Sequence, residues 1–367
     1  MEICGDSLDE ILIDLYQSLL GSGRPNTGSR GSTYEVLGAA IRLRKPRARL
    51  SRSENRGKPF SALAEFLWYL SGSGELEFIR PYIPDYEAEA VDGMIPGAYG
   101  PRIFSMRYGI DQLDNVTKLL KWKPTSKRAV IQLFDAEDIA LDYAAARGEG
   151  FIYREVPCTV SLQFHLREGL LHLSANMRSN DAYKGLPHDV FCFTMIQEMM
   201  ARRLDVEPGE YLHYAGSMHI YEPDLDKVRG YITEGHQKMV EMPPMPPGDA
   251  FGLAETLVAA EGRIRAGEPR SAAETTLAPY WADFLRLLEA FWASGDEAKL
   301  DALKAGITPA FRMFVDSRRD KPRRQPMPRQ AQFIRGFKRQ PELTPSRHED
   351  LTPMPVSSPR RAWGWGR

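Results

Sequence analysis

Alternating apolar and polar residues mark the middle of the chain. Val160, Leu162 and Phe164 alternate with polar residues, and the alternation returns over residues 171–177 after the turn-forming residues 167–169. A period of two is typical of a half-buried strand, and a short turn between two such runs is typical of a hairpin. The sequence therefore predicts a β-hairpin in this region.

Apolar residues spaced three and four apart predict several helices. These helices cover residues 6–20, 60–70, 109–123 and 189–204, and helical spacing returns over residues 250–316. Further strands are predicted over residues 129–134 and 211–216, and the second leads to His219 and Tyr221. Residues 21–32 predict a polar, glycine-rich loop, and residues 83–102 predict an irregular segment.

Changes in composition predict three regions. Pro and Met dominate residues 242–248, which indicates a linker. We expect a catalytic domain over residues 1–242, a helical appendage over residues 243–317 and a tail over residues 318–367. In the tail Lys and Arg outnumber Asp and Glu by 13 to 4, and its many prolines predict disorder. Contact between this basic tail and nucleic acid is one interpretation, and a solvated chain end without a specific partner is the one that we favour.

The other global features are those of an ordinary globular enzyme. No apolar run reaches the roughly eighteen residues of a membrane span, and the N-terminus has no secretory signal, so we expect a cytoplasmic protein. The three cysteines, Cys4, Cys158 and Cys192, are too few and too scattered for a disulfide framework or a metal site. Cys192 lies in a predicted apolar helix, where we expect it to be a core residue.

The predicted hairpin brings a thiol and a guanidinium together. Cys158 and Arg178 stand at its two outer ends, side by side. A thiol is a strong nucleophile only as the thiolate, and a fixed cation lowers the pKa of a thiol beside it. The same cation can also hold an anionic substrate.

Four blocks of sequence resemble the thymidylate synthase and pyrimidine nucleotide hydroxymethylase superfamily. In chain order they are Pro157-Cys158 with Gln163-Phe164, Arg178-Ser179 with Asp181, Gly185-Leu186-Pro187, and Gly216 with His219-Ile220-Tyr221. Their order and spacing follow the superfamily over residues 7–240. The resemblance implies an α+β fold, a thymidylate synthase-like mixed-sheet sandwich with surrounding helices. It also implies a homodimer with shared active sites, a pyrimidine nucleoside monophosphate as substrate and 5,10-methylenetetrahydrofolate as cosubstrate.

The resemblance assigns roles to individual residues. Cys158 would add to C6 of the pyrimidine, Glu65 would move protons through water, and Tyr99 would assist proton removal at C5. The expected phosphate ligands are Arg30, with Arg24 as the other candidate, Arg178, Ser179, and Lys127 and Arg128 of the partner subunit. His219 and Tyr221 would clamp the sugar, and Asp181, Ile83 and Gly185 would contact the folate. Outside this resemblance, Glu65 would be a helix-surface residue, and Lys127 and Arg128 would be solvated.

One departure from the resembling synthases concerns the base. They carry asparagine where this chain has Asp189, and an amide complements O4 and N3–H of uracil. A carboxylate instead accepts from the 4-amino group of cytosine, and the superfamily members that act on cytidylates carry aspartate here. Asp189 therefore favours cytosine as the base. The alternative is that Asp189 only caps the helix predicted to begin there.

A second departure concerns the product. Residues 84–88 contain no tryptophan where the resembling synthases place a pair against the folate, and the last residues are not their short apolar tail. Loss of this aromatic wall favours attack by water over hydride transfer. The leading hypothesis is a C5 hydroxymethyltransferase acting on dCMP or CMP. The alternatives are a thymidylate synthase methylating dUMP, a dUMP hydroxymethylase, and a nucleotide-binding or nucleic-acid-binding module that has kept the fold without the chemistry.

Overall fold

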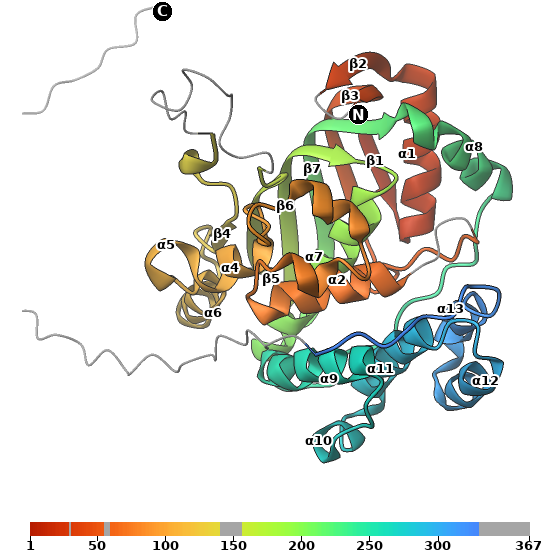
Figure 1. The fold of residues 1–367 in the computed structure, drawn as a ribbon. Coiled ribbons are helices and arrows are strands. Elements are labelled where there is room, and N and C mark those ends of the chain that lie inside the picture. Colours follow the sequence, from red (N-terminus) through yellow and green to blue (C-terminus); the bar gives the residue numbers. More distant parts are fainter. Residues whose placement is uncertain (29–30, 55–58, 140–155, 330–367) are drawn as a thin grey trace, which may run out of the picture. The chain divides into compact units, whose positions relative to one another are not determined.

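A mixed β-sheet carries the predicted hairpin at its centre (Figure 1). The structure is a computed structural model that describes residues 1–28, 31–54, 59–139 and 156–329. The seven strands of this part of the chain are ordered β1-β3-β7-β6-β5-β4, with β2 paired to β3. They are β1 (Glu2–Gly5), β2 (Arg24–Gly28), β3 (Gly31–Leu43), β4 (Val130–Gln132), β5 (Thr159–Arg167), β6 (Leu170–Asp181) and β7 (Glu207–Tyr221). The pairs β1–β3 and β6–β7 are parallel, and the others are antiparallel.

Helices cover one face of the sheet. The helices against it are α1 (Leu8–Ser22) and α7 (Gly185–Arg203), and α2 (Pro59–Ser71) packs on α7. The shorter elements are α3 (Leu76–Ile79), η1 (Pro84–Glu89), α4 (Tyr99–Phe104), α5 (Met106–Gly109), α6 (Gln112–Trp122), η2 (Ala136–Ile139), η4 (Glu222–Asp224) and α8 (Leu225–Glu234). The predicted fold class, a mixed sheet surrounded by helices, is confirmed.

The predicted hairpin is formed by β5 and β6. Its turn residues Glu168 and Gly169 both have positive φ, 51° and 76°, which suits the twist of a tight antiparallel turn. The ladder reaches back to the open ends of the two strands, where Arg178 N donates to Cys158 O at 2.8 Å. The hairpin therefore places the thiol and the guanidinium at the same sheet position, as the sequence predicts.

The helix α7 begins earlier than the sequence indicates. Its first residue is Gly185, whereas the sequence predicts a start at Asp189. Pro187 fits in the first turn because a backbone N–H there has no partner within the helix. Asp189 lies inside the helix, so the alternative that it caps the N-terminus is wrong.

The predicted loop over residues 21–32 contains a hairpin. Strand β2 pairs antiparallel with the start of β3, with Arg24 opposite Glu35. Glycine, proline and asparagine hide this strand from pattern analysis, because β2 is exposed along its whole length and has no alternation. Arg30 lies outside the described residues.

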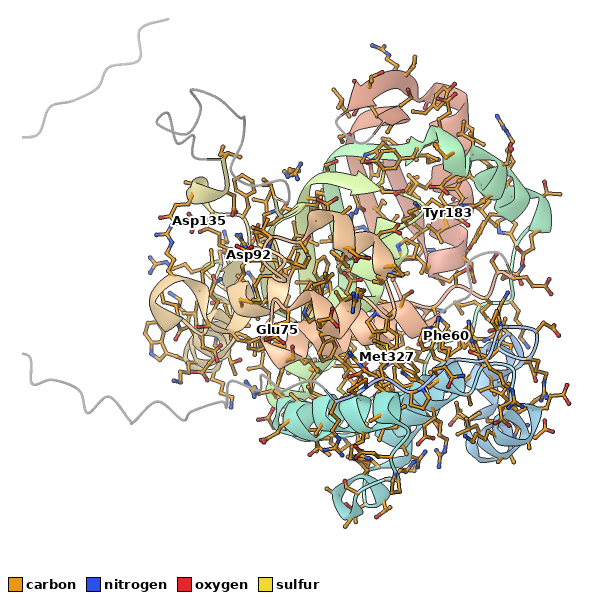
Figure 2. The ribbon with its side chains drawn as sticks, in the orientation of Figure 1. Phe60, Glu75, Asp92, Asp135, Tyr183 and Met327 are labelled. Atoms are coloured by element: carbon orange, nitrogen blue, oxygen red, sulfur yellow. The ribbon has the colours of Figure 1, made fainter. Side chains whose placement is uncertain are left out.

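A group of helices follows residues 242–248 and packs on α2. They are η5 (Ala250–Leu253), α9 (Ala254–Ala266), α10 (Ala272–Thr275), α11 (Pro279–Trp292), α12 (Glu297–Gly306), η6 (Pro309–Phe311) and α13 (Arg312–Asp316). Phe60 of α2 meets Phe291 of α11 at 5.8 Å between ring centres, and the Arg318 guanidinium lies over both rings. Figure 2 labels Phe60 and Met327 along this contact. Residues 318–329, the start of the predicted tail, thus lie against the helices, and residues 330–367 lie outside the described part of the chain.

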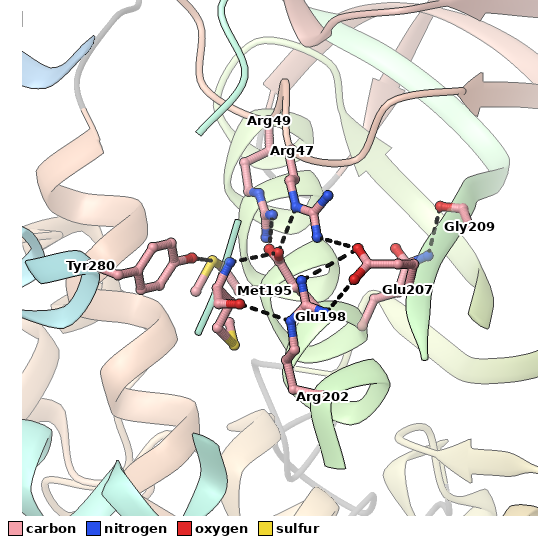
Figure 3. Close-up of polar contacts among 10 residues, drawn as sticks. Arg47, Arg49, Met195, Glu198, Arg202, Glu207, Gly209 and Tyr280 are labelled. Atoms are coloured by element: carbon pink, nitrogen blue, oxygen red, sulfur yellow. Dashed lines mark hydrogen bonds and ion pairs between the residues drawn. The ribbon is translucent and has the colours of Figure 1, made fainter. Parts of the chain in front are cut away.

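An ion network fixes α7 from within the core (Figure 3). Glu198 is fully buried and pairs with Arg47 at 2.7 Å and with the equally buried Arg49. Its Oε1 also accepts from Met245 N at 3.0 Å, so α7 is tied to the segment that leads into the C-terminal helices. The sequence gives no sign of this network, because its members lie far apart along the chain.

Candidate active site

Cys158 and Arg178 form the first part of the site. Arg178 Nη2 lies 3.8 Å from Cys158 Sγ. The guanidinium also donates through Nε to Pro157 O at 2.9 Å and through Nη2 to Val156 O at 2.8 Å. These two bonds hold a planar cation against the backbone that leads into Cys158, which is partly exposed. The arrangement is suited to keep a thiol reactive and to meet an anion from solvent.

Tyr99, at the start of α4, lies beside this pair. Its Oη accepts from Thr159 N at 3.1 Å and from Thr159 Oγ1 at 2.9 Å. Burial, with the charges of Asp189 and Cys158, raises the pKa of the Tyr99 hydroxyl well above its ordinary value. Tyr99 therefore keeps its proton and can donate it in a hydrogen bond, beside Thr159, the residue that follows Cys158.

Glu65 lies on the buried side of α2, and not on the surface of that helix. Tyr69 Oη and Tyr86 Oη donate to Oε1 at 3.0 and 2.8 Å, and His188 Nδ1 lies 2.7 Å from Oε2. Burial alone would raise the pKa of the carboxyl, but the bond and charge of His188, with the two hydroxyls, lower it below the ordinary value. Glu65 is therefore held as a carboxylate inside the protein.

Asp189 stands at the end of a buried row of hydrogen bonds. Asn180 Nδ2 donates to Asp189 Oδ2 at 2.7 Å, and Asn180 Oδ1 lies 3.0 Å from His213 Nε2. His213 Nδ1 in turn lies 2.8 Å from Tyr211 Oη. Burial lowers the pKa of His213 to about 3, so the ring is neutral, and Nε2 carries its proton because the Asn180 oxygen can only accept.

Burial also controls the charge of Asp189. It raises the pKa of this carboxyl well above the ordinary value, and the charge of Glu65 adds to the effect, whereas the Asn180 bond opposes it. Gly185 makes room for the pair, because a Cβ there would come within 3.2 Å of Asn180 Nδ2. The expected folate contact Gly185 thus also has a packing role in the site.

The sugar and folate candidates meet across β6 and β7. Asp181 is opposite His219 in the parallel register, and the rings of His219 and Tyr221 meet edge to face at 5.1 Å. Asp181 Oδ1 accepts from Tyr183 N and Lys184 N at 2.8 and 3.1 Å, and burial raises the pKa of its carboxyl. The structure therefore brings these three predicted residues together at one end of the sheet.

A close approach of two strands lies between this end of the sheet and the Cys158–Arg178 pair. A Cβ on Gly216 would lie 2.9 Å from Arg178 O, so a glycine is needed there for β6 and β7 to pair. Ser179 follows at the next position of β6, opposite Ser217. Arg178 and Ser179 therefore lie on the same paired strands as Asp181, His219 and Tyr221.

The other predicted residues stand apart within the described part of the chain. Lys127 and Arg128 are exposed on the turn before β4, and Ile83 is partly buried at the start of η1. Lys127 O accepts from Gln163 Nε2 at 2.9 Å and Arg128 N donates to Ser126 Oγ at 3.2 Å, so these two bonds involve only the backbone of the basic residues. Their expected role depends on a second subunit.

The sequence did not point to four residues of the site. Tyr86, His188, Asn180 and His213 hold the two buried carboxylates. Asn180 and His188 are neighbours of the motif residues, which is a usable signal. His213 and Tyr86 could be found only from the packing of distant elements.

Comparison with known proteins places this arrangement in a family. The sequence profile described as thymidylate synthase matches residues 14–245. A thymidylate synthase of Francisella philomiragia is 28% identical over 182 residues, which are 47% of this chain and 65% of that protein. A deoxyuridylate hydroxymethyltransferase of Bacillus phage SP01 is 29% identical over 249 residues, 64% of this chain and 62% of that protein. The chain thus spans less than two thirds of either relative. With the profile covering more than half of its length, it belongs to the thymidylate synthase family.

Proposed function

We propose that the protein transfers a hydroxymethyl group to C5 of a cytidylate, dCMP or CMP. Members of its family are one-carbon transferases that act on pyrimidine nucleotides with methylenetetrahydrofolate as cosubstrate. The observation that carries the choice of base is the orientation of Asn180, whose amide nitrogen faces Asp189.

The Asn180 amide makes Asp189 an acceptor. The Asn180 oxygen is occupied by His213, so only the Asn180 nitrogen is available to Asp189 Oδ2. An acceptor at this place suits the 4-amino group of cytosine and repels O4 of uracil. A protonated Asp189 would offer one donor and one acceptor, as an amide does, so the preference for cytosine rests on the carboxylate form of Asp189.

The remaining residues fit substitution at C5. Addition of Cys158 Sγ to C6 makes C5 nucleophilic, which is the purpose of a covalent adduct in this chemistry. Arg178 binds the nucleotide phosphate with Ser179, and with Arg30 or Arg24. Tyr99 and Glu65 handle the protons at C5 and at water, and His219 and Tyr221 hold the sugar.

The cosubstrate supplies the one-carbon unit, and Asp181 with the partly buried Ile83 offers it a polar and an apolar contact. In this chain η1 presents Tyr86, a residue with a hydroxyl, in the segment that lacks tryptophan. A polar group there supports delivery of water to the exocyclic carbon. The product would then be hydroxymethyl, with tetrahydrofolate released unoxidised.

A substrate panel tests the proposal. The protein is incubated with methylenetetrahydrofolate and either dCMP, CMP or dUMP, and products are identified by mass. We expect a mass gain of one hydroxymethyl group on a cytidylate, without dihydrofolate. Formation of dTMP from dUMP with release of dihydrofolate would contradict it.

The Asp189→Asn variant tests the basis of the choice. Because Asn180 offers an N–H, the new amide would turn its oxygen to Asn180 and its nitrogen to the base, which suits uracil O4. We expect the ratio of kcat/KM for cytidylate over dUMP to fall by roughly tenfold to a hundredfold, the equivalent of about 1–3 kcal/mol. An unchanged ratio would remove Asp189 from base recognition.

The second candidate is hydroxymethylation of dUMP. It is favoured by the similarity to the phage protein named as a deoxyuridylate hydroxymethyltransferase. The two candidates share every step except recognition of the base, so the substrate panel separates them directly.

We also propose a homodimer formed through the sheet face opposite α1 and α7. That face exposes Tyr214, at 42%, with the part-exposed Leu212, Ala40 and Asn176 beside it in register. Lys127 and Arg128 would reach the phosphate of the partner's nucleotide from the turn before β4. This assembly would explain why both are exposed on that turn in a single chain.

A further inference from the structure

Glu65 is surrounded by side chains from three separate elements. Tyr69 lies one turn further along α2, Tyr86 lies in η1, and His188 lies in the first turn of α7. All three bond to the carboxylate, and an ionised carboxylate can only accept, so His188 Nδ1 carries a proton. The surroundings of Glu65 thus favour a base rather than an acid.

Ser61 holds the second ring nitrogen of His188. His188 Nε2 lies 3.0 Å from Ser61 Oγ. A hydroxyl can donate to the neutral ring or accept from the protonated ring. Ser61 thus bonds to Nε2 while Nδ1 faces Glu65, so both ring nitrogens of His188 are held.

We propose that His188 and Tyr86 are positioning residues that keep Glu65 ionised and oriented as the base for the water that enters the product. The inference rests on the proposed function, and it holds whether the pyrimidine is cytosine or uracil. In the step concerned, water oxygen bonds to the exocyclic carbon and its proton passes to Glu65. The electron pair received by the ring then expels the Cys158 thiolate from C6, with no net oxidation or reduction.

The geometry gives each residue a distinct part. The two tyrosine hydroxyls both bond to Oε1, whereas the imidazole bonds to Oε2. A carboxylate oxygen has two lone pairs, so Oε2 can accept from a water while it keeps the imidazole. Tyr86 comes from η1, the segment in which this chain lacks the tryptophans of the resembling synthases. The segment that departs from the synthases thus supplies a side chain that bonds to Glu65, the proposed base.

Several other groups influence the charge of this pair. Asp189 and Cys192 lie on α7 near Glu65, and each has its pKa raised partly by the Glu65 charge. On its other side His188 lines, with Arg49 and Ser51, a cavity of about 20 Å³, room for roughly one water. The pH profile of turnover therefore reflects the whole group of residues. Substitution of His188 shows which part of the profile depends on that residue.

The test compares pH profiles of turnover for wild type, His188→Phe, His188→Gln and Tyr86→Phe. Phenylalanine keeps a ring but removes the donor that favours ionised Glu65, so the pKa of Glu65 rises. We expect turnover at pH 7 to fall by roughly tenfold to a hundredfold. We also expect the acid limb of the profile to move to higher pH, so that activity is partly recovered there.

The other variants give graded results. Glutamine keeps an N–H donor without a charge, so we expect a limb between those of wild type and His188→Phe. Tyr86→Phe should move the limb in the same direction, with the nucleotide Kd from calorimetry unchanged in all three variants. The matched control is His236→Gln at an exposed histidine beyond α8, which should keep the wild-type profile.

A purely structural role would give a different pattern. A loss that is equal at every pH, with the limb at its wild-type position, would overturn the inference. If melting curves show that His188→Phe does not fold, His188→Gln and the half-buried Tyr86→Phe decide the question by the same criterion. Failure of wild type to modify any pyrimidine nucleotide would instead refute the proposed function.

Discussion

The reactivity expected of Cys158 depends on a single guanidinium. Arg178 Nη2 is 3.8 Å from the sulfur and is fixed by bonds to Val156 O and Pro157 O. Its cationic charge favours the thiolate, and its removal leaves the thiol beside Tyr99, which is neutral. The charge of Arg178 beside Cys158 is therefore the property to change by mutation.

We predict that Arg178→Met slows alkylation of Cys158 by iodoacetamide at pH 7 by roughly tenfold, the effect of one lost neighbouring charge. Peptide mass spectrometry measures the rate at each cysteine. Cys4 is exposed and far from Arg178 in the sequence, so its rate in the same sample is the internal control. Equal slowing at Cys4 and Cys158 would indicate a global change instead.

Site residues could be predicted from the sequence where they match a motif of the resembling family. Cys158 and Arg178 stand at the open end of the hairpin, and the structure places them side by side as predicted. Asn180 and His213 select which atom Asp189 presents, and this depends on hydrogen-bond direction across two strands. Direction of this kind has no signature in composition or periodicity.

At the scale of elements, α7 is held by charge inside an apolar core. Glu198 is fully buried and faces Arg47 and Arg49. Burial raises the pKa of its carboxyl, but the two guanidinium charges outweigh burial and lower it below 4.5. Removing one member of such a group leaves an uncompensated buried charge.

We predict that Glu198→Gln lowers the free energy of unfolding by about 3–5 kcal/mol, measured with urea. Arg49→Met combined with Glu198→Met should recover much of the loss, because both buried charges are then gone. Glu289→Gln, at a less buried ion pair on α11, is the matched control and should cost about 1 kcal/mol or less. A double variant as unstable as Glu198→Gln would argue against charge as the cause.

The same network has a pH dependence of known sign. The pKa of Glu198 is lower in the folded state than its ordinary value of 4.5, so its contribution to stability is present above that value. The contribution is lost as pH falls below 4.5 toward the folded pKa. Urea midpoints of wild type should therefore fall more steeply below pH 4.5 than those of Glu198→Gln.

Element prediction succeeded where periodicity is strong. The helices α1, α2 and α11 and the hairpin β5–β6 follow clear patterns of three to four or of two. The hairpin β2–β3 was missed because β2 is exposed on both faces. β2 is held in place by β3, which in turn pairs with β7. The early start of α7 was missed because proline reads as a helix breaker unless its place in the first turn is known.

At the scale of the whole molecule, the C-terminal helices reach the site indirectly. Tyr82, in the segment that leads into η1, donates to Glu261 of α9 at 2.7 Å and accepts from Trp292 of α11 at 2.8 Å. Both partners lie beyond the residues matched by the family profile. The added helices therefore support the segment that carries Tyr86. Among described residues, every helix is too short or too polar to cross a bilayer.

The proposed sharing of active sites between two subunits gives a prediction for mixed subunits. Cys158→Ser and Arg128→Ala should each lower activity strongly, the first by removing the proposed nucleophile and the second by removing a proposed phosphate ligand of the partner. A heterodimer contains one site with Cys158 from one subunit and Arg128 from the other. Co-refolding the two variants should restore up to about one quarter of wild-type activity, since random pairing gives half heterodimers with one intact site each.

The control is a mixture of Cys158→Ser with Cys158→Ala, which can form no intact site and should stay inactive. Sedimentation velocity should find a dimer for each variant. No recovery in mixed dimers would place Arg128 outside the active site of the partner.

The row from Tyr211 through His213 and Asn180 to Asp189 has a consequence for how substrate range can change. A neutral imidazole accepts a hydrogen bond at one ring nitrogen and donates one at the other. Burial keeps the His213 ring neutral at any pH of a living cell. The Asn180 amide that faces Asp189 is thus backed by a row of hydrogen bonds that ends at the fully buried Tyr211. A substitution at Tyr211 can therefore change substrate specificity, although Tyr211 lies outside the binding pocket.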